Sequence, residues 1–199
     1  ATKNVSELHV YYSYYAHDLN SGSTFLDEDM LYVNPVNCCI YITGRENEAC
    51  ELQLNISSKW EYAGALKNEN NLLSASSFHE LADAPFICSA DMYHETYQVE
   101  NTLFHVWMRG AVRPNWNKLI PDFKACTTKQ REKFGEWPVS EYHFLIHVAS
   151  NRAYHGVEHQ SSTVIHIGPG VDLYGAVYDD LLGVCSHEVY HSWNVKSIR

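Results

Sequence analysis

The sequence predicts an α+β protein in which an antiparallel β-sheet or sandwich precedes a part that contains helices. Two observations support this prediction. Residues 1–112 contain short segments of aromatic and β-forming residues separated by polar turns, which is typical of antiparallel sheets. Residues 113–199 instead combine two segments with helical spacing and two strongly β segments. We therefore expect an N-terminal β domain over residues 1–112 and a second unit over residues 113–199.

Each strand expected in the first part has a run of β-forming residues or an apolar alternation. The expected strands are residues 7–16, 37–42, 50–56, 86–88 and 103–108. Leu52, Leu54 and Ile56 alternate with polar residues, so one face of that strand should be buried. The polar residues 67–71 are expected to form a loop.

The second part should begin with a helix that opens at Pro121 and ends at Gly135, because apolar residues recur between them at three- and four-residue spacing. Two strands should follow, at residues 142–148 and 163–167, with residues 156–158 in a loop or at a sheet edge between them. A last helix should start near residues 178–182.

The composition excludes several classes of protein. A chain of 199 residues with 45% hydrophobic residues can bury the core of one large or two small domains. A net charge of −10 argues against nucleic acid as a partner. No apolar run reaches the roughly 18 residues of a membrane span. The sequence does not determine the oligomeric state.

The cysteines predict neither a disulfide framework nor a thiolate metal site, because their spacing contains no C-x-x-C pair. We expect all six to be small buried side chains. No signal peptide is evident at Ala1, which favours a cytoplasmic location. A secreted or periplasmic location would require a leader that has been removed.

The last helix carries an H-E-x-x-H motif, in which His187 and His191 are four residues apart. On a helix both imidazoles lie on one face and can bind one metal ion. Glu188, next to the first histidine, can reach a water on that ion. The motif therefore predicts one Zn²⁺, with His187 and His191 as ligands and Glu188 as general base. The alternative is a partly exposed helix whose motif residues are simply solvated.

Two segments resemble one known family. Trp193-Asn194-Val195-Lys196 follows the motif, and residues 154–163 read YHGVEHQSST. Together they resemble the glycyl aminopeptidase family, metallopeptidase family sixty-one, with Val157 where leucine is more usual. The resemblance before residue 113 is more diffuse. It implies a β domain, then the first part of a thermolysin-like catalytic domain, and release of N-terminal Gly or Ala from peptides.

The resemblance also implies roles for further residues. Glu158 would pair with the α-ammonium of a peptide substrate that has a free N-terminus. Gly156 would let an extended substrate approach the strand closely. The third zinc ligand would be a glutamate on a helix beyond Arg199, so the chain alone should bind zinc weakly and be nearly inactive. His159 and His166 are alternative third ligands that no spacing supports.

Two other functions stay open. A zinc endopeptidase on the same helix would have no use for Glu158, and a non-catalytic peptide-binding module would have no use for Glu188. Lys196 and Arg199 should either pair with carboxylates beyond this chain or be solvated. His143 and His147 are expected to be packing residues.

Overall fold

The computed structural model describes residues 7–198, whose strands form three sheets. The two small sheets are antiparallel: β1 (Phe25–Leu26), β2 (Met30–Val33), β7 (Phe86–Ser89) and β4 (Glu61–Gly64); then β3 (Cys50–Gln53), β6 (Leu72–Ala75) and β5 (Lys67–Glu69). The third sheet contains β11 (Ala153–Glu158), β12 (Ser162–Gly168), β10 (Glu141–Val148), β9 (Thr102–Gly110) and β8 (Tyr93–Val99), in that order. The expected α+β class is confirmed.

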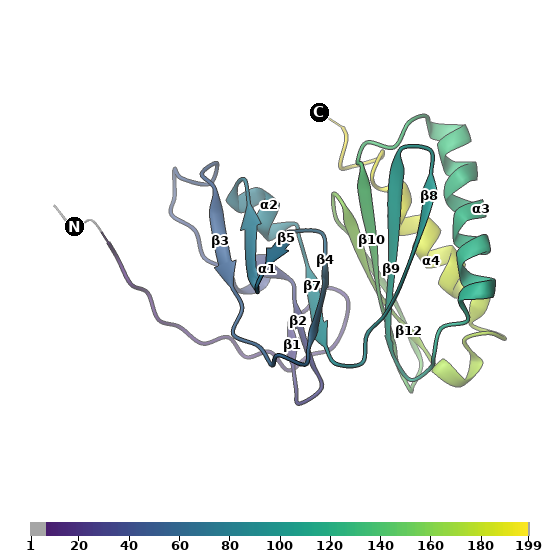
Figure 1. Cartoon of the computed structure of the whole chain (residues 1–199), viewed down its shortest axis with the longest axis horizontal. Coiled ribbons are helices and arrows are strands. Elements are labelled where there is room, and N and C mark those ends of the chain that lie inside the picture. Colours follow the sequence, from purple (N-terminus) through teal and green to yellow (C-terminus); the bar gives the residue numbers. More distant parts are fainter. Residues whose placement is uncertain (1–6, 199) are drawn as a thin grey trace.

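Two long helices cover one face of the five-stranded sheet, and the two small sheets lie on its other side (Figure 1). The long helices are α3 (Trp116–Phe134) and α4 (Tyr178–Tyr190), and the shorter ones are α1 (Pro35–Cys38), α2 (Phe78–Ala82) and the 3₁₀-helix η1 (Gly170–Asp172). Helix α4 begins where the sequence predicts, and α3 ends as predicted at Gly135, whose φ of 94° favours glycine.

Alternate side chains of the five-stranded sheet point to opposite faces and pack in two different clusters. On β10, Phe144 and Ile146 face the core under the helices, where they pack with residues such as Phe123 of α3 and Val184 of α4. Leu145 faces the other way and packs in a cluster with Met30, Tyr32, Ala63 and Ile87 of the small sheets. The five-stranded sheet is therefore buried on both faces, and β10 pairs in parallel with both its neighbours.

The sheets divide the chain at a different place from the expected domain boundary. Strands β8 and β9 pair with β10, so residues 93–110 belong to the same sheet as the segments that follow residue 113. The last strand of the small sheets is β7, which ends at Ser89. The boundary between residues 112 and 113 stays a prediction, and the sheet topology favours a boundary near residue 90.

Two expected strands are absent. Residues 7–16 run out from the body as an extended arm without a ladder partner, and Tyr11 and Tyr15 are 90% and 85% exposed (Figure 1). Residues 37–42 do not form a strand because Pro35 starts the helical turn α1, which Cys39 closes by donating its amide to the Pro35 carbonyl. The strands expected at 50–56, 86–88, 103–108, 142–148 and 163–167 are all present, the first over residues 50–53 only.

Two local predictions were wrong for reasons of turn and helix chemistry. Residues 67–71 form β5 and a tight turn to β6 rather than a loop, because Asn70 and Asn71 both adopt positive φ, at 54° and 66°. Helix α3 starts at Trp116, and Pro121 lies inside it rather than at its start. A proline in the second turn removes one backbone hydrogen bond without ending the helix.

All six cysteines are free thiols, and Cys88 and Cys185 are buried as expected while the other four are half-buried. Within residues 7–198, none of the helices combines the length and the hydrophobicity that a membrane span requires.

Burial of histidines between the sheets predicts acid destabilisation. Burial, with smaller contributions from His105 and His94, lowers the pKa of His143 to about 3. Because this pKa lies below the unfolded value of about 6.5, the unfolded chain takes up the proton first. The contribution of His143 to stability is therefore complete above pH 6.5 and is lost as the pH falls from 6.5 towards 3, by at most about 2 kcal/mol at pH 5.

Urea unfolding at pH 7.5 and pH 5 measures this effect. His143→Asn keeps a hydrogen-bond acceptor for Trp107 and should reduce the loss of stability between the two pH values. His17→Asn, at an exposed position on the arm, is the control and should leave that loss unchanged. An equal loss in wild type and His143→Asn would contradict the prediction.

Candidate active site

The H-E-x-x-H motif lies at the C-terminal end of α4, where His191 is the residue that caps the helix. Val184 and Val189 of this helix are buried against the sheet. His187 is exposed, His191 is half-buried and Glu188 is only 6% exposed. One ligand atom from each of these three side chains lies within 4.8 Å of the others. The structure therefore brings together the predicted ligands and the predicted base.

The two imidazoles fit a zinc ion. Their Nε2 atoms are 3.3 Å apart and their rings are nearly perpendicular, at 86°. Tetrahedral zinc with bonds of about 2.0–2.1 Å places two ligand atoms about 3.3 Å apart. The Nδ1 atom of His191 is 3.0 Å from the carbonyl oxygen of Asn194, which can only accept a hydrogen bond. Nδ1 therefore carries the proton, and Nε2 keeps the lone pair that a metal requires.

Gly156 of β11 makes room for the carboxylate of Glu188. A Cβ atom at residue 156 would lie 2.6 Å from Cγ and 2.7 Å from Cδ of Glu188, closer than side-chain atoms approach one another. The strand and the helix are thus in contact at the predicted base. The predicted role of Gly156 in admitting a substrate stays a prediction, but its position gives it a structural role that the sequence did not reveal.

Glu158 lies at the end of β11, which is an edge strand of the five-stranded sheet. Side chains two residues apart on a strand point to the same face, so Glu158 shares the face of Gly156, towards α4. Ser21 ties the N-terminal loop to this strand by donating from its hydroxyl to the carbonyl oxygen of His155, at 2.8 Å. The site thus has one carboxylate on the helix and a second on the neighbouring strand edge.

The surroundings of Glu188 raise its pKa. Burial raises the pKa of Glu188 above its usual value, and the nearby Glu158 carboxylate raises it further. His187, His191 and His155 act in the opposite direction. A carboxylate with a raised pKa is a stronger proton acceptor than an exposed one.

Neither alternative third ligand joins this group. His159 is bound to Asp83, whose carboxylate oxygen is 3.1 Å from its Nδ1 atom. His166 stacks on His147 with 5.0 Å between ring centroids. Among residues 7–198, the metal-ligating group around α4 contains His187, Glu188 and His191 alone.

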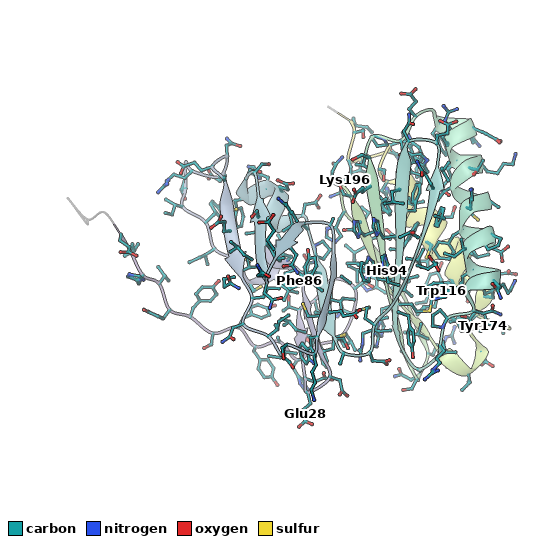
Figure 2. All side chains as sticks on the ribbon, viewed as in Figure 1. Glu28, Phe86, His94, Trp116, Tyr174 and Lys196 are labelled. Atoms are coloured by element: carbon teal, nitrogen blue, oxygen red, sulfur yellow. The ribbon has the colours of Figure 1, made fainter. Side chains whose placement is uncertain are left out.

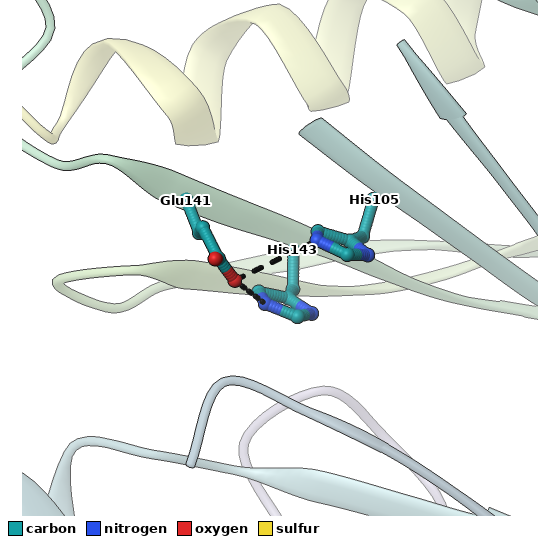
Figure 3. A group of neighbouring side chains, drawn as sticks. All are labelled: His105, Glu141 and His143. Carbon is teal, nitrogen blue, oxygen red and sulfur yellow. Dashed lines mark ion pairs between the residues drawn. The ribbon is translucent and has the colours of Figure 1, made fainter. Parts of the chain in front are cut away.

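A second His–Glu–His group lies on the other face of the sheet (Figure 3). The Nε2 atoms of His105 and His143 are 3.7 Å and 4.0 Å from a Glu141 oxygen. The two rings are parallel within 1°, so their lone pairs do not converge on one point. The indole N–H of Trp107 donates to Nδ1 of His143, which places the proton of the neutral ring on Nε2. This tautomer leaves no lone pair on Nε2 for a metal, so the group is a packed stack, as expected for His143.

Two partners of the site could not be found by motif reasoning. One is the carbonyl oxygen of Asn194, in the segment after the motif. It is a backbone atom, so the residue type at this position does not reveal the contact with His191. Lys196 pairs with Asp83 at 2.8 Å, a carboxylate within this chain rather than beyond it. Arg199, to which the same expectation applies, lies outside the described residues.

Gly156→Ala should destabilise the protein by about 1–3 kcal/mol, because the new methyl group would collide with Glu188. Gly183→Ala on α4 is a matched control, since a Cβ atom there meets nothing within 4 Å. In a helix that change should stabilise by up to about 1 kcal/mol. Urea unfolding of both variants checks the prediction. A Gly156→Ala protein as stable as wild type would show that Glu188 has room to move away.

Comparisons with known proteins concern the first part of the chain and the fold. Residues 1–90 match the model of the peptidase M61 N-terminal domain, a match that ends before both motifs. No curated protein matches the chain. The structure is similar to an aminopeptidase N family protein from Idiomarina loihiensis, with a TM-score of 0.84 and 26% identity over 93% of this chain and 34% of that one. The chain thus spans about a third of that protein's length.

A more distant similarity concerns the fold alone. An M1 zinc metallopeptidase from Deinococcus radiodurans matches with a TM-score of 0.51 and 10% identity, over 85% of this chain and 41% of that one. The family resemblance is therefore confirmed at a coarser level. The first 90 residues are similar to the N-terminal domain of M61 peptidases, and the fold is similar to that of the Idiomarina aminopeptidase N family protein and, more distantly, of the Deinococcus M1 zinc metallopeptidase.

Proposed function

We propose that this chain supplies the N-terminal domain and the first part of the thermolysin-like catalytic domain of a zinc-dependent aminopeptidase. The observation that carries the proposal is the pair of imidazoles on α4, whose Nε2 atoms are 3.3 Å apart and whose His191 tautomer is the one that binds metal. The similarity to zinc metallopeptidases supports the same conclusion.

The residues on α4 have distinct roles in this proposal. His187 and His191 would hold one zinc ion, which when bound lowers the pKa of its water and polarises the scissile carbonyl. Glu188 accepts a proton from the attacking water and then donates it to the leaving nitrogen. Contact with Gly156 holds the Glu188 side chain between the helix and the strand, so the base has a fixed position.

Glu158 would select substrates with a free N-terminus. It lies on the face of β11 that holds Gly156 against Glu188, and its charge acts on that carboxylate. A carboxylate on this face can pair with an α-ammonium group and leave the first peptide bond beside the base. Beyond His155, whose carbonyl oxygen accepts a hydrogen bond from the Ser21 hydroxyl, the edge of β11 can hold the backbone of the substrate as an added strand. The preference for Gly or Ala rests on the family resemblance.

A full-length protein that contains this chain should release p-nitroaniline from Gly- and Ala-p-nitroanilide. A chelator should abolish the activity and zinc should restore it. The matched variant Glu188→Gln should keep about one equivalent of zinc and lose at least about 100-fold in kcat, because only the proton transfer is removed. No turnover in wild-type protein loaded with zinc would contradict the aminopeptidase proposal. Loss of zinc in Glu188→Gln would contradict the role of that residue as base.

Glu158→Ala in the same protein should reduce kcat/KM for free-amine substrates by at least about tenfold more than for N-acetylated ones. The comparison also distinguishes the two rival functions. A zinc endopeptidase would cleave blocked peptides well and show an equal effect on both substrates. A binding module would cleave neither.

A further inference from the structure

One carboxylate of the N-terminal part reaches both segments that carry the proposed site. Asp83 follows α2 directly. One of its oxygens accepts a hydrogen bond from Lys196 Nζ at 2.8 Å and lies 3.1 Å from His159 Nδ1. Its other oxygen accepts a hydrogen bond from the backbone N–H of Gln160 at 2.8 Å. We refer to these four residues as the Asp83 junction.

The junction joins the two halves of the proposed site. His159 and Gln160 come directly after Glu158, at the end of β11. Lys196 belongs to the segment after the motif, and its backbone N–H donates to the carbonyl oxygen of His191 at 3.1 Å. Figure 2 shows Lys196 on the side of the five-stranded sheet that faces the small sheets. Asp83 therefore connects the strand end that bears Glu158 to the helix end that bears His191.

The Asp83 junction is shielded from solvent enough to hold the end of β11 and the segment after the motif together. The side chain of Lys196 is 22% exposed and that of Asp83 is 29% exposed, whereas both partners of the surface pair Lys67–Glu69 are more than half exposed. Burial alone would raise the pKa of Asp83, but the hydrogen bonds from His159, Lys196 and Gln160 lower it overall. The carboxylate is therefore ionised at neutral pH, and three donors converge on it.

We infer that Asp83 is a positioning residue that sets the separation between Glu158 and the two metal-binding histidines. The inference rests on the proposed function, in which that separation decides whether a free α-ammonium group and the scissile bond can be held together. It gives the N-terminal part a role in substrate selection, because the carboxylate comes from the residue that follows α2 and not from the five-stranded sheet. A displacement of the end of β11 would move Glu158 away from the position in which it can hold the α-ammonium group beside the base.

The test compares two inhibitors of the full-length, zinc-loaded protein. Glycine hydroxamate carries an amine that Glu158 can bind, whereas acetohydroxamate has no amine. In wild type, glycine hydroxamate should have the lower inhibition constant. Asp83→Asn, which removes the charge but little volume, should reduce this ratio about tenfold. The inhibition constant of acetohydroxamate should stay within about twofold of wild type.

Matched variants separate positioning from general damage. Lys196→Met should reduce the ratio as Asp83→Asn does, and Lys196→Arg should restore most of it. Glu69→Gln removes the carboxylate of an exposed lysine pair elsewhere and should change nothing. In the metal-free protein, hydrogen exchange of the segment that contains Gln160 should accelerate in Asp83→Asn, because its N–H loses an ionised acceptor, while α4 and β10 exchange as in wild type.

The outcomes distinguish this inference from the proposed function. A wild-type protein that binds both hydroxamates equally would overturn the amine-anchor function and the inference with it. If wild type prefers the amine and Asp83→Asn leaves the ratio unchanged, only the positioning role is overturned. Equal weakening of both inhibitors would show that Asp83 acts on the fold as a whole, which would also overturn the positioning role.

Discussion

The contact between Gly156 and Glu188 is the constraint on which the site depends. A glycine on an edge strand lets a buried carboxylate of the neighbouring helix occupy the space where a side chain would be. This contact fixes how closely α4 lies against β11. It thereby fixes where Glu158, two residues further along the same face, stands relative to the helix. The burial that raises the pKa of Glu188 is a consequence of the same close approach.

Two groups of the same residue types have different chemistry here because their hydrogen-bond partners differ. His191 faces a backbone carbonyl, which accepts a hydrogen bond from Nδ1–H and leaves Nε2 with its lone pair. His143 faces an indole N–H, which donates a hydrogen bond to Nδ1, so the neutral ring carries its proton on Nε2. The nearly perpendicular rings on α4 can converge on one ion, whereas the parallel rings on the sheet cannot. The outer partner of a histidine thus decides whether it can be a ligand.

The sequence was informative where local patterns decide the structure. The H-E-x-x-H spacing placed His187 and His191 on one helix face, and alternating or strongly apolar runs identified β7, β9, β10 and β12. It failed where the outcome depends on distant partners. The aromatic arm at residues 7–16 has the composition of a strand but finds no neighbouring strand.

The Asp83 junction shows the same limit at the site. Asp83 and Lys196 are separated by 113 residues, and no spacing rule connects them. The close contact of Gly156 with Glu188 could not be predicted from the sequence either, because it depends on how α4 packs against β11. Helix-face residues were thus predictable, and residues that join separate segments were not. The family match covers residues 1–90, whereas the motifs lie after residue 150. The two observations are therefore independent, because they involve different parts of the chain.

The mixed sheet has a practical consequence for dissecting this protein. A fragment that began at residue 113 would contain α3, β10 and α4 but would lack β8 and β9. β10 would then become an exposed edge whose central residues Phe144, Leu145 and Ile146 are now almost completely buried. A long apolar edge strand is a template for aggregation. An expression fragment that starts near residue 90 would keep all five strands together, and poor solubility of a shorter one would reflect a severed sheet rather than an unstable active site.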